Sequence, residues 1–187
     1  MSTGRLTPLT PPYETAVEEQ LRTMMPPGVP PIALFRTFAR NLPMARAMGE
    51  WGRYELSKQL SLPVRARELV IDRVTARCGC EYEWGVHLAF FGDRAGLTPE
   101  QCRSITHGTP DDPCWSREDT CLLRAVDELH DRADIGDATW DELAGWLSPE
   151  QLLDLLLLAG WYHAISYAAN AARVPLEPGA PRFADFS

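Results

Sequence analysis

The sequence predicts an all-α protein. Apolar residues recur at helical spacing along most of the chain, and proline or glycine stands at the ends of these segments. No segment shows the strict alternation expected of a half-buried strand. The chain has 187 residues, with 45% apolar and 24% charged, which suits one well-packed domain and is short for two. We therefore expect a single helical domain.

The first part of the chain is divided by prolines. Residues 1–12 contain three prolines and are expected to form an extended arm. Helices are expected over 13–25, 32–39 and 42–60. A Pro-Pro-Gly sequence ends the first of these, and two prolines precede the second, where proline is tolerated at the first helical position.

The middle of the chain predicts two consecutive helices. Pro63 begins the first, which should run to about Arg77, and Gly79 marks its end. The second should run over 81–95 and be closed by Gly96. Because the connection is so short, we expect the second helix to fold back on the first.

The last part of the chain contains two near-identical helix starts. Residues 98–101 (TPEQ) and 148–151 (SPEQ) each have a hydroxyl at the N-cap, a proline next and a glutamine that can reach back. A turn-rich connector is expected over 107–113, a helix over 116–131 and a long helix over 148–172. This last helix is apolar on nearly all sides, which is typical of the centre of a protein or of an oligomer interface. The domain is expected to span residues 13–175, and residues 176–187 to form a C-terminal tail.

Charge and hydropathy exclude several classes of function. The net charge of −8 argues against a nucleic-acid-binding surface. The densest apolar segment, residues 152–160, is interrupted by Asp154 and is much shorter than a membrane span. The N-terminus lacks the basic start and apolar block of a secretory signal. We expect a cytoplasmic protein that binds neither membrane nor nucleic acid.

The cysteines and histidines do not form a recognisable metal motif. An odd number of cysteines, five, favours free thiols over a disulfide framework. Cys78 and Cys80 form a CxC sequence rather than the CxxC of zinc sites, and no HxH or HExxH pair occurs among the four histidines. We predict no metal and no cofactor, although ligands could still assemble across helices.

The strongest catalytic candidates are Glu83 and His87. Their spacing of four places both side chains on one helical face, together with Cys80, Trp84 and Phe91. Partly buried carboxylates and imidazoles have the shifted pKa values that acid–base catalysis requires. The alternative is an ordinary pair of helix side chains beside a thiol that behaves as a small buried hydrophobe.

Other candidates lie on neighbouring helices. Glu68 stands among apolar residues, so it is either a buried partner of the site or a solvated, ion-paired glutamate. His163 and Tyr167 form a polar stripe on the long apolar helix, and a core network or an oligomer contact is the simpler interpretation for them. Together with Tyr82 and Trp84, they are our candidates for contacts with a substrate.

The segment from Glu68 to His87 resembles the carboxymuconolactone decarboxylase family, which includes alkylhydroperoxidase D. The peroxidase branch has a glutamate, eleven residues, Cys-x-x-Cys, three residues and a histidine. Glu68, Cys80 and His87 stand at matching positions, but Glu83 replaces the second cysteine. The resemblance is densest over residues 62–108 and implies an alkylhydroperoxidase D-like helical bundle that forms trimers or hexamers.

The missing cysteine favours acid–base chemistry over thiol chemistry. A two-cysteine peroxidase cycle needs a resolving thiol, whereas the decarboxylase branch has a glutamate and a histidine at the spacing of Glu83 and His87. The resemblance implies that His87 is the general acid or base on a carboxylated or enolisable small molecule, assisted by Glu83, Glu68 and Cys80. A thiol-dependent peroxidase using Cys80, an isomerase or hydrolase, and a non-catalytic binding protein remain alternatives.

The resemblance also leads to a geometric prediction. If the second helix folds back on the first, Glu68 should be mostly buried and should form a direct or water-bridged hydrogen bond with His87 or Cys80. Because two carboxylates near one imidazole cannot titrate independently, at least one of them should have a raised pKa.

Overall fold

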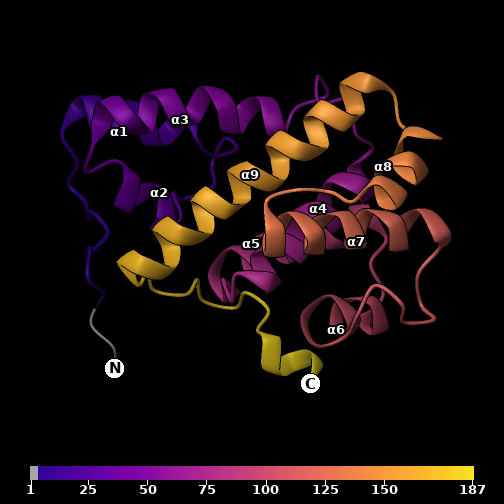
Figure 1. Ribbon diagram of the computed structural model, residues 1–187. Coiled ribbons are helices and arrows are strands. Elements are labelled where there is room, and N and C mark those ends of the chain that lie inside the picture. Colours follow the sequence, from indigo (N-terminus) through magenta and orange to yellow (C-terminus); the bar gives the residue numbers. More distant parts are fainter. Residues whose placement is uncertain (1–3) are drawn as a thin grey trace.

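The structure is a computed structural model that describes residues 4–187, and within this range it contains helices and no strand (Figure 1). The all-α prediction is therefore confirmed. The elements in chain order are α1 (Thr15–Thr23), α2 (Ala33–Phe38), α3 (Leu42–Glu55), α4 (Val64–Arg77), α5 (Glu81–Ala95), α6 (Pro99–His107), α7 (Arg117–Arg132), α8 (Asp137–Ala144), α9 (Pro149–Ala172) and the 3₁₀ helix η1 (Phe183–Phe186).

The sequence predicted most of these helices but missed two short elements. Helix α8 was not predicted, because it has only eight residues and no side chain caps its N-terminus. The short helix η1 lies in the segment expected to be a plain tail. The helix predicted over 42–60 ends earlier, at Glu55. Both predicted capping boxes of the TPEQ and SPEQ segments are present.

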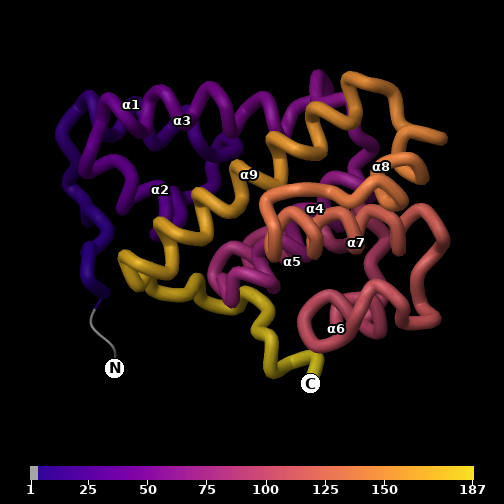
Figure 2. Tube along the Cα trace, viewed as in Figure 1, coloured from indigo at the N-terminus to yellow at the C-terminus, as the bar shows by residue number. Residues whose placement is uncertain are grey.

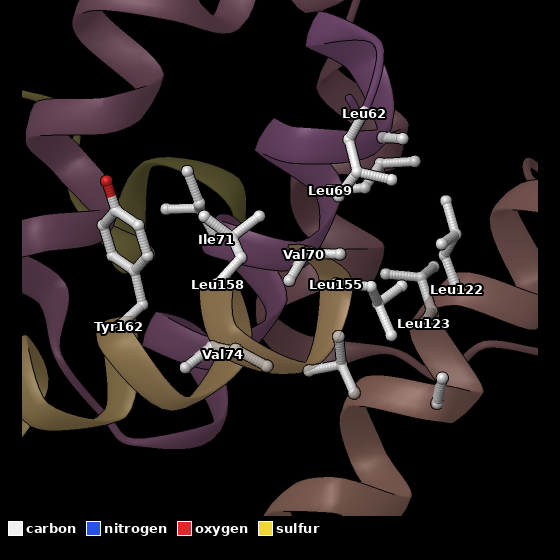
Figure 3. Close-up of a cluster of buried hydrophobic side chains, with 14 of the residues drawn as sticks. Leu62, Leu69, Val70, Ile71, Val74, Leu122, Leu123, Leu155, Leu158 and Tyr162 are labelled. Atoms are coloured by element: carbon white, nitrogen blue, oxygen red, sulfur yellow. The ribbon is translucent and has the colours of Figure 1, made fainter. Parts of the chain in front are cut away.

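Helices α4 and α9 form the centre of the molecule. Helix α4 packs against α5, α7 and α9, and α9 runs diagonally across the bundle (Figures 1 and 2). Leu69, Val70 and Ile71 of α4 are completely buried, and Val70 and Ile71 lie beside Leu155 and Leu158 of α9 (Figure 3). Burial of each such side chain contributes about 1.5–3 kcal/mol. This core fixes the backbone from which the polar residues of α4 project.

Helix α9 is long and apolar enough to cross a membrane by length and composition alone. Half of its most apolar window is buried inside the protein. The buried central helix of a helical domain can be equally long and apolar. The length and composition of α9 therefore agree with its central position against α4.

A tight turn at Gly79 connects α4 to α5. Gly79 has a φ of 60°, a left-handed conformation that favours glycine. The amide of Cys80 donates to the carbonyl of Thr75 at 2.8 Å, which closes the end of α4. Helix α5 thus returns along α4, as the sequence predicted.

Both ends of the chain are attached to the helical body. In the described part of the arm, the amide of Arg5 donates to the carbonyl of Ala172 at 2.8 Å, and that of Leu9 donates to the carbonyl of Arg36 at 3.2 Å. Residues 1–3 of the expected arm lie outside the described residues. At the other end, Phe183 of η1 packs on the core.

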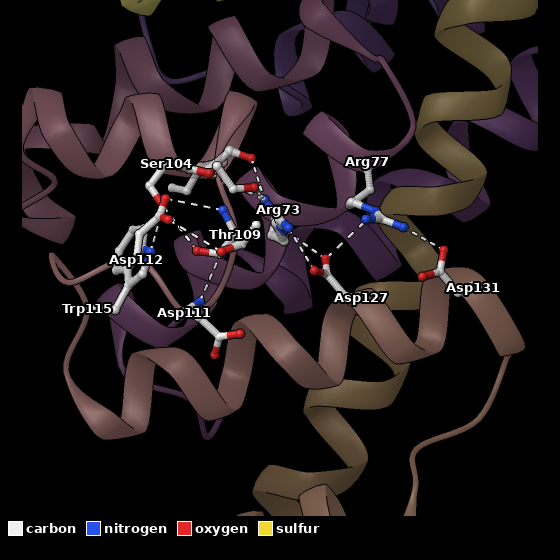
Figure 4. Close-up of polar contacts among 11 residues, drawn as sticks. Arg73, Arg77, Ser104, Thr109, Asp111, Asp112, Trp115, Asp127 and Asp131 are labelled. Carbon is white, nitrogen blue, oxygen red and sulfur yellow. Dashed lines mark hydrogen bonds and ion pairs between the residues drawn. The ribbon is translucent and has the colours of Figure 1, made fainter.

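A buried ion-pair network joins α4 to α7. Arg73 forms a bidentate pair with Asp127, both contacts being 2.7 Å, and also donates to the backbone carbonyls of Ser104, Ile105 and Gly108 at the end of α6 (Figure 4). One turn further along α4, Arg77 pairs with Asp131 near the surface. Arg73 therefore links three helices through one guanidinium.

Glu55, the last residue of α3, is a buried carboxylate that should make stability depend on pH. Its side chain is 1% exposed, and neither carboxylate oxygen has a partner among the described residues. Burial, assisted by the charge of Asp154, raises the pKa of Glu55 from 4.5 to about 7. The folded state therefore holds a proton that the unfolded chain releases above about pH 4.5.

We expect the wild type to lose stability as pH rises from about 4.5 to about 7, and Glu55→Gln to reduce this loss. Thermal melts at pH 5 and pH 8 measure the difference, with the exposed Glu50→Gln on the same helix as the control. If Glu55→Gln and the wild type respond identically to pH, the assignment of a buried, protonated Glu55 is wrong.

Candidate active site

A largely apolar cavity of about 350 Å³ lies between α2, α3, α5 and α9. Its acidic and basic lining side chains are Glu83, His87 and Arg53. Its apolar lining includes Leu34, Phe35, Phe38, Met48, Val86, Phe90, Phe91, Trp161, Tyr162 and Ile165. A concave apolar site with a few convergent polar groups is typical of small-molecule binding.

His87 is held in a fixed orientation at the wall of this cavity. Its Nδ1 donates to the Oε2 atom of Glu68 at 2.8 Å, and its Nε2 lies 3.6 Å from the Oε1 atom of Glu83. Tyr162 packs edge-on against the imidazole with 4.9 Å between ring centroids, and Phe91 covers it at 5.4 Å. Because Nδ1 is occupied by Glu68, Nε2 is the nitrogen left for chemistry.

Glu68 lies behind the imidazole rather than in the cavity. It is completely buried on α4, and its second oxygen accepts from the Nε atom of Arg67 at 2.6 Å. Arg67 in turn stacks over Phe91, 4.9 Å from the ring centroid. The predicted hydrogen bond between Glu68 and His87 is therefore present, and the alternative of a solvated Glu68 is wrong.

The electrostatics of this pair favour an imidazolium beside a carboxylate. Burial by itself would raise the pKa of Glu68, but the charge and hydrogen bond of His87, together with Arg67, lower it. Burial would lower the pKa of His87, but the charge and hydrogen bond of Glu68, with the charges of Glu83 and Asp72, raise it. His87 can therefore carry a proton close to neutral pH.

Glu83 is the carboxylate that lines the cavity with His87. It is buried, its Oε2 atom has no partner among the described residues, and burial raises its pKa. Asp72, one turn along α4 from Glu68, is also buried, and burial together with the charge of Glu68 raises its pKa well above the usual range. The expected raised carboxyl pKa is thus found at Glu83 rather than at Glu68.

Cys80 does not lie in the cavity. It stands at the N-cap of α5, its side chain is completely buried in the apolar cluster between α2, α5 and α9, and it is not among the lining residues. Burial raises the pKa of its thiol to about 11. The sequence placed Cys80 on the same stripe as Glu83 and His87, but the helix begins only after Cys80 and turns its side chain into the core.

Trp84 and Tyr82 also point away from the cavity. Trp84 is completely buried and packs against Phe183 and Phe186 of η1, with centroid distances of 5.1 and 5.6 Å. The hydroxyl of Tyr82 donates to Glu177 at 2.7 Å and accepts from the amide of Leu34 at 2.9 Å. Both residues attach the C-terminal segment to α5, so the structure gives them no contact with a ligand in this cavity.

His163 and Tyr167 lie on another side of α9. The Nδ1 atom of His163 donates to the carbonyl of Ala159 at 2.8 Å, and its Nε2 faces the Nδ1 atom of His130 of α7 at 3.0 Å. Tyr167 is 66% exposed. Their neighbour Tyr162, by contrast, lines the cavity, because consecutive helical residues point in different directions.

Sequence reasoning missed the contributions of α2 and α3 to this cavity. Arg53 of α3 lines it and is exposed, and it is the cation among the lining residues. Phe38 and Met48 supply apolar wall from the same region. Nothing in the local sequence of α3 marks Arg53, because the cavity forms only when α3 packs across α5 and α9.

Comparisons with known proteins agree with this fold. Residues 43–123 match the model of the carboxymuconolactone decarboxylase family. No curated protein matches the chain. A peroxidase-related protein from Silicibacter sp. TM1040 superimposes with a TM-score of 0.81 at 14% identity, covering 100% of this chain and 99% of the other.

Two further solved structures share the fold at low identity. A complex of a cysteine-to-alanine variant of the debrominase Bmp8 with 2,3,4-tribromopyrrole has a TM-score of 0.76 at 16% identity and covers 95% of this chain and 94% of the other. A protein of unknown function from Agrobacterium tumefaciens, for which an AhpD antioxidant role has been suggested, has a TM-score of 0.67 at 20% identity. The superposition covers 75% of this chain and 95% of the other.

The matched segment contains the residues around which the site is built. It extends from the start of α3 into α7, and it includes Glu68, Glu83 and His87. The helical arrangement shared with the Agrobacterium protein extends over 75% of this chain. Residues 43–123 of the chain are therefore similar to the carboxymuconolactone decarboxylase family.

Proposed function

We propose that this protein is an enzyme that transfers protons to or from a carboxylated or enolisable small molecule. The observation that carries the proposal is the buried array Glu68–His87–Glu83, whose last two members line an apolar cavity. The array supplies an oriented imidazole with a raised pKa and a neighbouring carboxyl that can exchange a proton with it.

The geometry supports a simple sequence of proton transfers. In a decarboxylation, the bond between carbon and the carboxylate breaks, carbon dioxide leaves, and the electron pair remains on the substrate as an enolate. The Nε2–H of His87 then protonates the enolate carbon, while Glu68 keeps its hydrogen bond to Nδ1. His87 regains its proton from Glu83 or from water. In an isomerisation, the same groups would first abstract a proton from one carbon of the substrate and then return it to another.

The lining suggests which substrates fit. Arg53 offers a guanidinium for a carboxylate, and the aromatic walls formed by Phe38, Phe90 and Phe91 suit a small ring. The Bmp8 complex with 2,3,4-tribromopyrrole supports the view that the fold accommodates a small ring compound. We therefore propose lactone carboxylates and 3-oxo carboxylates as the first classes to test.

Hydrogen–deuterium exchange tests this proposal without knowledge of the natural substrate. The protein is incubated in D₂O with a panel of lactone carboxylates and oxo carboxylates, and deuterium at carbon is followed by NMR. Catalysed exchange or decarboxylation that depends on His87 supports the proposal. Hydroperoxide consumption with a dithiol reductant, in the absence of any exchange activity, would instead favour the thiol-dependent peroxidase.

The peroxidase alternative has less support from the geometry. The Cys80 thiol is buried away from the cavity, and its raised pKa leaves it protonated at neutral pH. Glu83 stands where a resolving cysteine would be needed. A debrominase activity like that of Bmp8 is another alternative on the same fold, and the panel should therefore include a brominated pyrrole.

We also propose a homo-oligomer, a trimer or hexamer, assembled through α9. Its outer face exposes Leu153, Leu157 and Tyr167, which are 60%, 52% and 66% exposed in the isolated chain. A row of apolar side chains on one helix is typical of a protein–protein contact. We expect light scattering to give a multiple of 20.9 kDa and Leu157→Glu to shift the protein toward the monomer. A wild-type monomer at micromolar concentration would exclude this assembly.

A further inference from the structure

A cluster of three metal-ligating side chains lies apart from the proposed catalytic array. Cys78 at the end of α4, His130 in the last turn of α7 and His163 in the middle of α9 come from three different helices. One donor atom of each residue lies within 4.8 Å of the others. The sequence predicted no metal, because the three residues are separated by 52 and 33 positions and form no motif.

The donor atoms are spaced as a tetrahedral metal requires. The Sγ atom of Cys78 lies 3.9 Å from the Nδ1 atom of His130, which lies 3.0 Å from the Nε2 atom of His163. Tetrahedral zinc, with bonds of about 2.3 Å to sulfur and about 2.0–2.1 Å to nitrogen, separates these atoms by about 3.6 and about 3.3 Å. These two distances therefore differ from the tetrahedral values by only a few tenths of an ångström, and the donor atoms of the third pair, Cys78 and His163, lie within 4.8 Å of each other.

The surroundings hold two of the ligands in the orientation that a metal needs. His163 donates its Nδ1–H to the carbonyl of Ala159, which leaves the lone pair of Nε2 directed at the cluster. The side chain of Asn170 donates to the backbone carbonyl of Cys78 at 2.9 Å and ties the end of α4 to α9.

Acidic residues offset the positive charge that lies closest to the cluster. Arg77 is the closest basic group on α4, but it is paired with Asp131 and lies 3.8 Å from Asp127 (Figure 4). The three ligand residues are partly exposed, so an ion and a water molecule can reach them. Three protein ligands with an open fourth position are typical of zinc sites that bind water or a substrate.

We infer that Cys78, His130 and His163 form a binding site for a divalent transition metal of the zinc class, with the fourth position open. The mixed thiolate and imidazole donors select zinc over magnesium or calcium. On binding, the thiol of Cys78 loses its proton to solvent and its sulfur bonds the metal. The proton that His130 shares with His163 moves to the Nε2 atom of His130, so that Nδ1 becomes a ligand.

Titration of chelator-treated, full-length protein with Zn²⁺ tests this site independently of activity. We expect one Zn²⁺ per chain by calorimetry, a rise in melting temperature with Zn²⁺, and a sulfur-to-metal charge-transfer band when Co²⁺ replaces it. Cys78→Ser should abolish the band, and His163→Gln should weaken Zn²⁺ binding by more than about 10–100-fold, the usual cost of losing only an outer-sphere partner.

The matched control is Cys114→Ser, which removes another half-buried thiol that belongs to no such cluster. It should leave stoichiometry, affinity and the Co²⁺ band unchanged. Thermal melts of each metal-free variant show whether it folds. If Cys78→Ser does not fold, His130→Gln takes its place as the second ligand variant. Absence of the Co²⁺ band in the wild type, or Zn²⁺ binding unaffected by both histidine variants, would overturn the inference.

Discussion

His87→Gln should reduce the rate of proton exchange or turnover by about 10²–10⁴-fold, the usual contribution of a general acid or base. Glutamine preserves most of the packing against Tyr162 and Phe91 but cannot carry the proton. The rate of deuterium incorporation by the best compound of the panel measures the effect. Cys80→Ser is the matched control, and it should retain most of the activity because its side chain does not reach the cavity. A larger loss of activity in Cys80→Ser than in His87→Gln would point to thiol chemistry.

The Glu68 carboxylate provides an additional test of the same array. Because its charge raises the pKa of His87, Glu68→Gln should lower that pKa and move the pH at which the protonated form is lost to lower values. NMR titration of the imidazole measures the shift directly, and the pH dependence of the rate should follow it. If Glu68→Gln changes neither, Glu68 has only a structural role.

Arg73→Met should lower the free energy of unfolding by about 3–5 kcal/mol, the cost typical of breaking a buried ion pair by removing one partner. The side chain of Arg73 is 5% exposed, and its loss leaves Asp127 with only the 3.8 Å contact to Arg77 and the carbonyls at the end of α6 without this donor. Urea denaturation at fixed protein concentration measures the change.

Arg77→Met on the same helix is the matched control for this prediction. Its pair with Asp131 is partly exposed to solvent and its contact with Asp127 is long, at 3.8 Å, so the expected loss is at most about 1 kcal/mol. Equal losses in the two variants would show that the carbonyls capped by Arg73 find other partners, and that the guanidinium does not hold α4, α6 and α7 together.

Local sequence determined the helices and their ends. Proline, glycine and the two capping boxes act within a few residues, so the boundaries of α4, α5, α6 and α9 were predictable. The turn at Gly79 also predicted that α5 returns along α4, and with it the contact between Glu68 and His87. Glu68 and His87 belong to adjacent helices of one hairpin, so their contact could be predicted without knowing how the other helices pack.

Only the tertiary structure decided which other residues share a site. Cys80 and Trp84 lie on the same hairpin as His87, but the packing of α9 and of the C-terminal segment directs them into the core. Arg53 reaches the cavity because α3 packs across two distant helices. Cys78, His130 and His163 converge from three helices. Such placements depend on contacts between residues far apart in sequence, and no local pattern of side chains encodes them.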